Sequence, residues 1–257
     1  MKVRHIFSGM MITASLILGA CSAPKDITYV QGLTDKESSN VSNPLTIKVR
    51  PEDKLDIIVS TQREELNNLF NLRSPQTAGT DRPSYTVNPE GYINFPMLGE
   101  IHVAGLTRAE VAKYIEKELT EKDLVKNPVV IVEYENTAIY VGGEVNAPGK
   151  FEINKDRLTV LQAVLMAGDL TIQGKRENVL VLREENGKQT AYRLDLTDPD
   201  QLFNSPAYYL QQNDVVYVEP NDVRKRQTTT NGNTALTATF WMSVASLAMT
   251  IAVLIFR

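Results

Sequence analysis

Few residues in this chain can carry out nucleophilic or metal-assisted chemistry. Its 257 residues include one Cys, Cys21, and two His, His5 and His102. A zinc cluster needs several Cys or His ligands, a disulfide needs two Cys, and a Cys/His catalytic pair needs both residue types close together. We therefore expect no catalytic residue and no metal site, and we predict that the protein is not an enzyme.

Cys21 is placed for a different reaction, the attachment of a lipid. A basic and then apolar N-terminal stretch ends in Leu18-Gly19-Ala20-Cys21, which is the build of a secretory signal. Small residues directly before a Cys resemble the lipobox of bacterial lipoproteins, in which the Cys is acylated and becomes the first residue. We predict a lipoprotein signal peptide over residues 1–20 and a covalent lipid on Cys21 as the only cofactor. An ordinary signal peptide with a buried or free Cys is the alternative.

The C-terminal end predicts a second membrane attachment. Residues 235–256 run for 22 residues without a charge, after the basic run Arg224-Lys225-Arg226. At about 1.5 Å per residue such a helix is roughly 33 Å long, and a hydrocarbon core is about 30 Å thick. We predict a transmembrane helix over 235–256, preceded by a linker over 221–234 whose basic run anchors it at the interface.

The hydroxyl residues of this predicted helix fall on one face. They are separated by four, three and four residues, so at 100° per residue they lie within about 60° of one another. Periodicity leaves two interpretations open, which are close packing of neighbouring helices and a water-filled lumen shared by several copies. The hydroxyl face holds Thr239, Ser243, Ser246 and Thr250, and the opposite face holds Trp241, Val244, Ile251 and Ile255.

Charge and composition limit the partners. The chain has 27 Lys and Arg against 31 Asp and Glu, a net charge of −4. Nucleic-acid binding relies on a basic excess that neutralises phosphates, so we exclude nucleic acid as a partner.

Between its two ends the chain alternates short strands and helices. Residues 21–44 are polar and predict a tether. Thr107 and Glu110 form a capping box, and Thr159 and Gln162 form another, so each predicts a helix start. We predict strands over 45–49, 55–59, 85–87, 92–95, 100–103, 128–134, 139–141, 149–153, 179–182, 190–194 and 214–218, with a further helix over 62–72. The result is two small α+β units in tandem.

Residues 87–107 carry a resemblance to a known family. They read Val87-Asn-Pro-Glu-Gly-Tyr-Ile-Asn-Phe-Pro-Met-Leu-Gly-Glu-Ile-His-Val-Ala-Gly-Leu-Thr107, which is similar to the polysaccharide export domain of outer-membrane polysaccharide export lipoproteins. Residues 49–57 resemble the opening of that domain, with Glu52 where the family usually has Gly. Residues 141–151 and 159–168 resemble its SLBB β-grasp domain, with Asp169 where a second Gly is common.

The resemblance implies the fold class and the domain order. We expect an α+β protein with a polysaccharide export domain over 45–136, a β-grasp SLBB domain over 137–220, and the C-terminal transmembrane helix.

The resemblance also implies a function in a capsule or exopolysaccharide translocon. The family forms a ring-shaped homo-oligomer in the periplasm, its C-terminal helices build an α-helical pore through the outer membrane, and it docks on an inner-membrane polysaccharide co-polymerase. We expect this chain to be lipid-anchored in the outer membrane and to pass polysaccharide through a lumen lined by Thr239, Ser243, Ser246 and Thr250. We expect Trp241, Val244, Ile251 and Ile255 to face lipid.

The competing interpretation is a periplasmic sugar-binding or scaffolding lipoprotein whose terminal helix only anchors it. Tyr208, Tyr209 and Tyr217 are the aromatic residues that could stack on sugars, although core packing is their commoner use.

Overall fold

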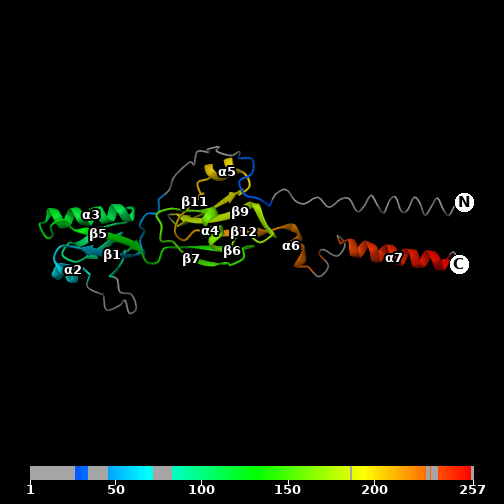
Figure 1. Cartoon of the computed structure of the whole chain (residues 1–257), viewed down its shortest axis with the longest axis horizontal. Helices are drawn as coiled ribbons and strands as arrows, with labels where there is room; N and C mark the ends of the chain where they lie inside the picture. Colours follow the sequence, from blue (N-terminus) through cyan, green and yellow to red (C-terminus); the bar gives the residue numbers. More distant parts are fainter. Residues whose placement is uncertain are drawn as a thin grey trace.

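The computed structural model describes residues 27–33, 46–71, 83–185, 187–229, 232 and 237–255. Cys21, the predicted signal peptide and most of the predicted tether lie outside these residues. The described chain forms two α+β units that follow one another, and a separate apolar helix, α7, comes after them (Figure 1). The predicted fold class is confirmed.

The first unit is built on a three-stranded antiparallel sheet in the order β2-β1-β5. Alternate residues of β1 are buried on one face, and the buried stripe of α3 contains Val111, Ile115 and Leu119. Helix α3 packs on β5, while α2 packs against β1 (Figure 1). The elements are β1 (Lys54–Ser60), α2 (Glu64–Phe70), β2 (Ser84–Thr86), β3 (Tyr92–Phe95), β4 (Gly99–His102), α3 (Arg108–Glu121) and β5 (Val129–Tyr134).

The second unit is a five-stranded mixed sheet in the order β10-β9-β12-β6-β7. The central strands β12 and β6 are parallel, and the other neighbouring pairs are antiparallel. Helix α4 and the small β8-β11 pair complete its core. The elements are β6 (Ala138–Gly143), β7 (Gly149–Glu152), β8 (Leu158–Thr159), α4 (Val160–Met166), β9 (Gly174–Glu185), β10 (Lys188–Leu194), α5 (Pro199–Asn204), β11 (Tyr209–Leu210), β12 (Val215–Pro220) and α6 (Asp222–Gln227). The separate helix α7 (Ala238–Ile255) follows them.

Both predicted capping boxes start a helix. The Thr107 hydroxyl accepts the Glu110 amide at 3.3 Å, and the Glu110 carboxylate accepts the Thr107 amide at 2.7 Å. Thr159 and Gln162 make the same reciprocal pair at the start of α4. Each box satisfies two backbone amides that the first helical turn leaves without partners.

Of the strand predicted over 45–49, the structure describes residues 46–49, and these are not part of any sheet. Residues 46–50 have no regular secondary structure, and Ile47 and Val49 are buried as the alternation predicts. Their backbone groups bond to loops instead, because Ile47 N donates to Asp156 O at 2.9 Å and Val49 N donates to Leu106 O at 2.8 Å. The segment therefore joins the two units rather than extending a ladder.

Polar side chains also fasten the two units together. Gln212 Nε2 donates to Asp53 Oδ1 at 2.8 Å, Arg108 is ion-paired with Asp156, and Arg50 is hydrogen-bonded to Gln211. Asp53 and Gln212 are both buried. Burial raises the pKa of Asp53 above its ordinary value, and the hydrogen bonds from the Arg50 amide and Gln212 offset only part of that rise.

This junction predicts a pH effect on stability. Because the pKa of Asp53 is higher in the folded protein than in the unfolded chain, the folded state holds this proton more tightly. The contribution of Asp53 to stability is complete below an unfolded pKa of about 3.9 and is lost as pH rises through the folded pKa. We expect the stability of Asp53→Asn relative to wild type to increase as pH rises above 4. Urea unfolding at a series of pH values measures this difference, and a constant difference contradicts it.

Gly143 is required by the close approach of β6 to β12. Its φ of 87° is in the left-handed region, and a Cβ there would lie 2.1 Å from Val218 O. The neighbouring Gly142 has open space at the same position. We expect Gly143→Ala to cost more than the roughly 1–2 kcal/mol of left-handed strain, because the carbonyl must also move. Gly142→Ala is the matched control and is expected to stay close to wild type in thermal unfolding. Equal melting temperatures for the two variants contradict this.

Candidate functional site

The C-terminal helix α7 is long and apolar enough to cross a membrane, by length and composition. Its 18 residues form one continuous helix, and none of them is buried against the rest of the described chain. A core helix of a soluble protein passes the same composition test but is buried, and a signal sequence lies near the N-terminus. Neither explanation suits α7.

The four predicted hydroxyl residues share one face of this helix, as their spacing requires. Ser243 Oγ donates to Thr239 O at 2.9 Å, and Thr250 Oγ1 donates to Ser246 O at 2.9 Å. In these bonds the hydroxyl protons are donated to carbonyl oxygens of the same helix. The hydroxyl oxygens of Ser243 and Thr250 can therefore accept hydrogen bonds from outside the helix. The resulting strip is polar and uncharged.

The opposite face of α7 carries large apolar side chains. Trp241, Val244, Ile251 and Ile255 are all exposed, and the Trp241 ring packs edge-on against Phe240 at 5.6 Å between centroids. An aromatic pair in the first turns of a spanning helix is typical of the membrane–water interface. Two chemically different faces are therefore available on α7, and which one meets lipid stays a prediction.

A short N-terminal segment, residues 27–33, binds along the second unit, and we call it the strap. Val30 N donates to Leu196 O at 2.9 Å, and Gln31 N donates to Thr197 O at 2.7 Å. The Tyr29 hydroxyl donates to the Asp169 carboxylate, and the Arg176 guanidinium lies 5.6 Å from the centre of the Tyr29 ring. Burial, together with the Asp169 hydrogen bond, raises the pKa of Tyr29 to about 12.

Helix α6 is fastened close to the strap. Asn221 N donates to Gln173 O at 2.7 Å, and Lys175 is ion-paired with Asp222 at 3.1 Å. Arg224 is paired with Glu144 at 3.0 Å. The segment predicted as a linker thus begins with a helix, and its basic run bonds to the second unit. The strap and α6 both contact residues 169–176, on the side of the second unit away from the first unit (Figure 1).

The strap yields a prediction about its own attachment. Tyr29→Phe removes a hydrogen bond to a charged acceptor, worth about 1.5–3 kcal/mol, and keeps the ring under Arg176. We expect the strap to detach more often, so limited proteolysis within residues 27–33 of the complete chain becomes roughly tenfold faster or more. Thr28→Val, at a side chain with no role in the Asp169 contact, is the control. Unchanged cleavage in Tyr29→Phe shows that the backbone bonds alone hold the strap.

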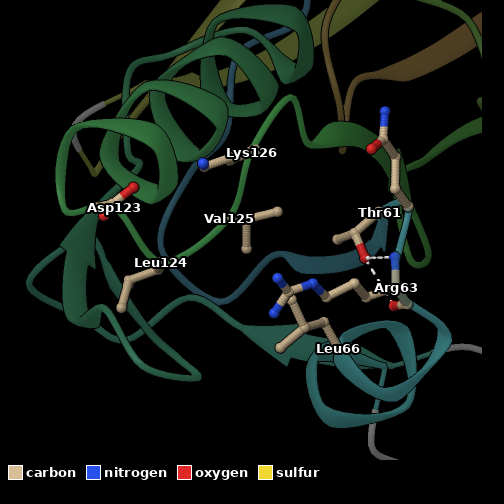
Figure 2. Close-up of a pocket in the computed structure, with 8 residues that line it drawn as sticks. Thr61, Arg63, Leu66, Asp123, Leu124, Val125 and Lys126 are labelled. Carbon is tan, nitrogen blue, oxygen red and sulfur yellow. Dashed lines mark hydrogen bonds between the residues drawn. The ribbon is translucent and has the colours of Figure 1, made fainter.

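A hollow of about 300 Å³ lies at the opposite end of the molecule, between α2 and the loop that follows α3 (Figure 2). Arg63 extends into it between Leu66 and Val125, and Lys126 also lines it. Thr61 holds the Arg63 backbone, since its hydroxyl donates to Arg63 O at 2.8 Å and accepts Arg63 N at 3.2 Å. The cations of Arg63 and Lys126 and the carboxylate of Asp123 make the lining of this hollow polar.

Both units match known protein families. The family described as polysaccharide biosynthesis/export protein matches residues 41–135, and the SLBB domain matches residues 137–218. The chain belongs to the polysaccharide export family. Its first unit is therefore the export domain, and its second unit is the SLBB domain.

Named proteins from other bacteria are similar to this chain. The EPS I polysaccharide export outer membrane protein EpsA of Ralstonia solanacearum is 31% identical over 221 residues, which are 83% of this chain and 57% of that protein. The exopolysaccharide production protein ExoF of Rhizobium meliloti (strain 1021) is 26% identical over 169 residues, which are 56% of this chain and 39% of that protein. The chain spans about half the length of the curated relatives it matches.

At the two positions where this chain lacks the family's usual glycine, the backbone still has the left-handed conformation that favours glycine. Glu52 has a φ of 71° and Asp169 has a φ of 72°, both in the left-handed region. Asp169 follows Gly168, whose φ of 73° places a left-handed residue just after the end of α4. The turn at Glu52 is held by the Asp53 carboxylate, which accepts the Arg50 amide at 2.7 Å. Local hydrogen bonds thus stabilise a backbone conformation that glycine adopts without strain.

The tyrosines predicted as possible sugar-stacking residues differ in their exposure to solvent. Tyr208 is buried and packs edge-on against Phe203 and Tyr209, so it serves the SLBB core. Tyr217 is exposed on β12. His102 packs edge-on against Tyr92 in the β3-β4 hairpin. In the described ranges, no group of three or more His, Cys, Asp or Glu residues is arranged to hold a metal ion. Cys21 lies outside them.

Proposed function

We propose that this protein is an outer-membrane lipoprotein that exports capsular or extracellular polysaccharide through a pore built from several copies of α7. The observation that carries the proposal is the uncharged hydroxyl strip on a membrane-length helix that follows an export domain and an SLBB domain. The name of the EpsA relative, a polysaccharide export outer membrane protein, supports the substrate class and the membrane.

A single helix encloses nothing, so the pore needs a ring. With helices about 10 Å wide, five leave a central hole of roughly 7 Å and eight leave roughly 16 Å. Only the larger ring admits a hydrated sugar chain. Backbone amides are satisfied within each helix, so a wall of helices is stable in lipid. Neutral hydroxyls suit the lumen, because a charged wall would bind an ionic polysaccharide and slow its release.

The contacts of the strap and α6 support one orientation of the chain. The strap follows Cys21, α6 precedes α7, and both are bound at one end of the SLBB domain. A lipid on Cys21 and a membrane-spanning α7 therefore place the SLBB domain next to the outer membrane. The export domain then extends into the periplasm. Its Arg63 and Lys126 hollow (Figure 2) faces the inner-membrane polysaccharide co-polymerase that we propose as its partner.

Thiol labelling tests which face of α7 meets water. Ser243→Cys and Thr250→Cys are expected to react with a membrane-impermeant maleimide in intact outer membranes, whereas Trp241→Cys and Ile251→Cys are expected to stay unlabelled. The unsubstituted chain controls for Cys21. Labelling at 241 and 251 but not at 243 and 250 reverses the assignment of the two faces.

A further inference from the structure

The SLBB sheet has one face that nothing in the described part of the chain covers. Tyr140 on β6 and Tyr217 on β12 are 43% and 41% exposed, and Val215 between them is 37% exposed. Val215 is in register with Tyr140 on one side and with Leu182 of β9 on the other. Large apolar side chains from three neighbouring strands therefore form one surface, which we call the sheet patch.

A second apolar surface lies over α4. Leu165 and Met166 are 63% and 42% exposed, and the nearby Ile172 is 77% exposed. Helix α4 contains no charged residue, although 23% of the chain is charged. Leu165 and Met166 also line a hollow of about 500 Å³ between α4 and the segment after β7. We call this surface the helix patch.

The two patches lie on opposite sides of the SLBB domain. Strand alternation turns Val216 and Val218 to the face opposite Val215 and Tyr217, and both are fully buried. Helix α4 packs on that buried face through Val160, Ala163 and Val164. Leu165 and Met166 therefore point outward from the far side of the helix layer. One chain cannot bring the two patches together, so a contact between them requires two copies.

The patches also suit each other in shape and in polarity. The tyrosine rings of the sheet patch stand out from a sheet, and the helix patch is hollowed beside Leu165. Charged groups lie at the edges, since Lys150 is in register with Tyr140, and Glu152 and Lys155 border the hollow. An uncharged centre with a polar rim is typical of interfaces between proteins.

We infer that the sheet patch of one copy packs against the helix patch of the next, and that this contact closes the ring. The inference rests on the proposed function. Copies whose helices cross one membrane in the same direction are related by rotation about the membrane normal. Two different patches on opposite sides of one domain then make a head-to-tail contact that repeats around a ring. A two-fold contact through one patch leaves the other exposed to water.

Cross-linking between two tagged copies tests the contact. Full-length chains carrying Tyr217→Cys and Leu165→Cys, each with a different tag, are produced together in the native host and treated with a short bismaleimide. We expect a cross-linked pair that contains both tags. The chain that carries both substitutions is expected to give a ladder that ends at the ring size. The export-domain variant Ile131→Cys, at an exposed apolar residue, is the matched control and is expected to give at most about a tenth of the product with Leu165→Cys.

The other outcomes separate the inference from the proposed function. Efficient cross-linking of Tyr217→Cys to itself shows a two-fold contact and overturns the inference. If rings are seen in detergent without a cross-link between residues 217 and 165, the inference is wrong, but the proposed pore is not contradicted. A monomeric chain contradicts the pore itself. If Tyr217→Arg keeps the ring but loses retention on immobilised polysaccharide, the sheet patch binds glycan and the inference is wrong.

Discussion

Tryptophan at Ser246 of α7 is expected to reduce export of polysaccharide to background, whereas tryptophan at Val244 leaves it near the wild-type amount. Ser246 lies on the hydroxyl strip, and Val244 lies about 160° away on the same helix. In the proposed ring each copy adds its own indole, and a ring of eight copies would place eight bulky groups in a lumen only about 16 Å wide. At Val244, on the face that we predict to meet lipid, the added rings would lie outside the lumen.

The measurement is the polysaccharide released by cells whose only copy of the gene carries the substitution. Immunoblots of the outer-membrane fraction confirm equal amounts of each variant. Ser246→Ala is a further control, because it removes the hydroxyl without filling space and is expected to export normally. If Val244→Trp blocks export and Ser246→Trp does not, α7 faces the other way.

Removing the carboxylate of Asp214 is expected to destabilise the SLBB domain by about 3–5 kcal/mol. Arg183 and Asp214 form an ion pair at 2.8 Å, with side chains only 2% and 1% exposed. The guanidinium also donates to Tyr209 O at 2.8 Å and to Pro206 O at 3.2 Å. Asp214→Ala leaves a buried cation with backbone acceptors alone, which is the costly case.

Urea unfolding of the detergent-solubilised chain measures this loss. Glu219→Ala is the matched control, because its exposed pair with Arg193 is worth at most about 1 kcal/mol. The double variant Arg183→Met with Asp214→Leu is expected to recover part of the stability, because it removes both charges and keeps the volume but takes the Arg183 donors from Tyr209 O and Pro206 O. A loss in Asp214→Ala no larger than in Glu219→Ala shows that water reaches the pair.

Regular alternation and helix caps made most of the fold predictable. Strands such as β1 and β5 bury every second residue, and the capping boxes at Thr107 and Thr159 mark helix starts through neighbours three residues apart. Such signals are local, so one sequence contains them. The two-residue strands β8 and β11 and the six-residue helix α5 are too short to show a period.

Contacts between residues far apart in the sequence could not be predicted from sequence patterns. Tyr29 and Asp169 are separated by 140 positions, and Asp53 and Gln212 by 159. Nothing in the spacing of either pair indicates contact. The hydroxyl strip of α7 was predictable because a helix repeats every 3.6 residues. The sheet patch was not, because the order of five strands decides that Tyr140 and Val215 are neighbours.

The strap sets a limit on how far the domains can stand from the bilayer. Ile27, its first residue, lies six positions after Cys21, and six fully extended residues reach at most about 22 Å. If Cys21 carries a lipid, these six residues keep the SLBB domain close to the inner leaflet of the outer membrane. In the ring proposed above, a tether this short would leave little open gap between the SLBB domains and the bilayer, and a sugar chain that enters from the export domains would have no side exit before it reaches the membrane.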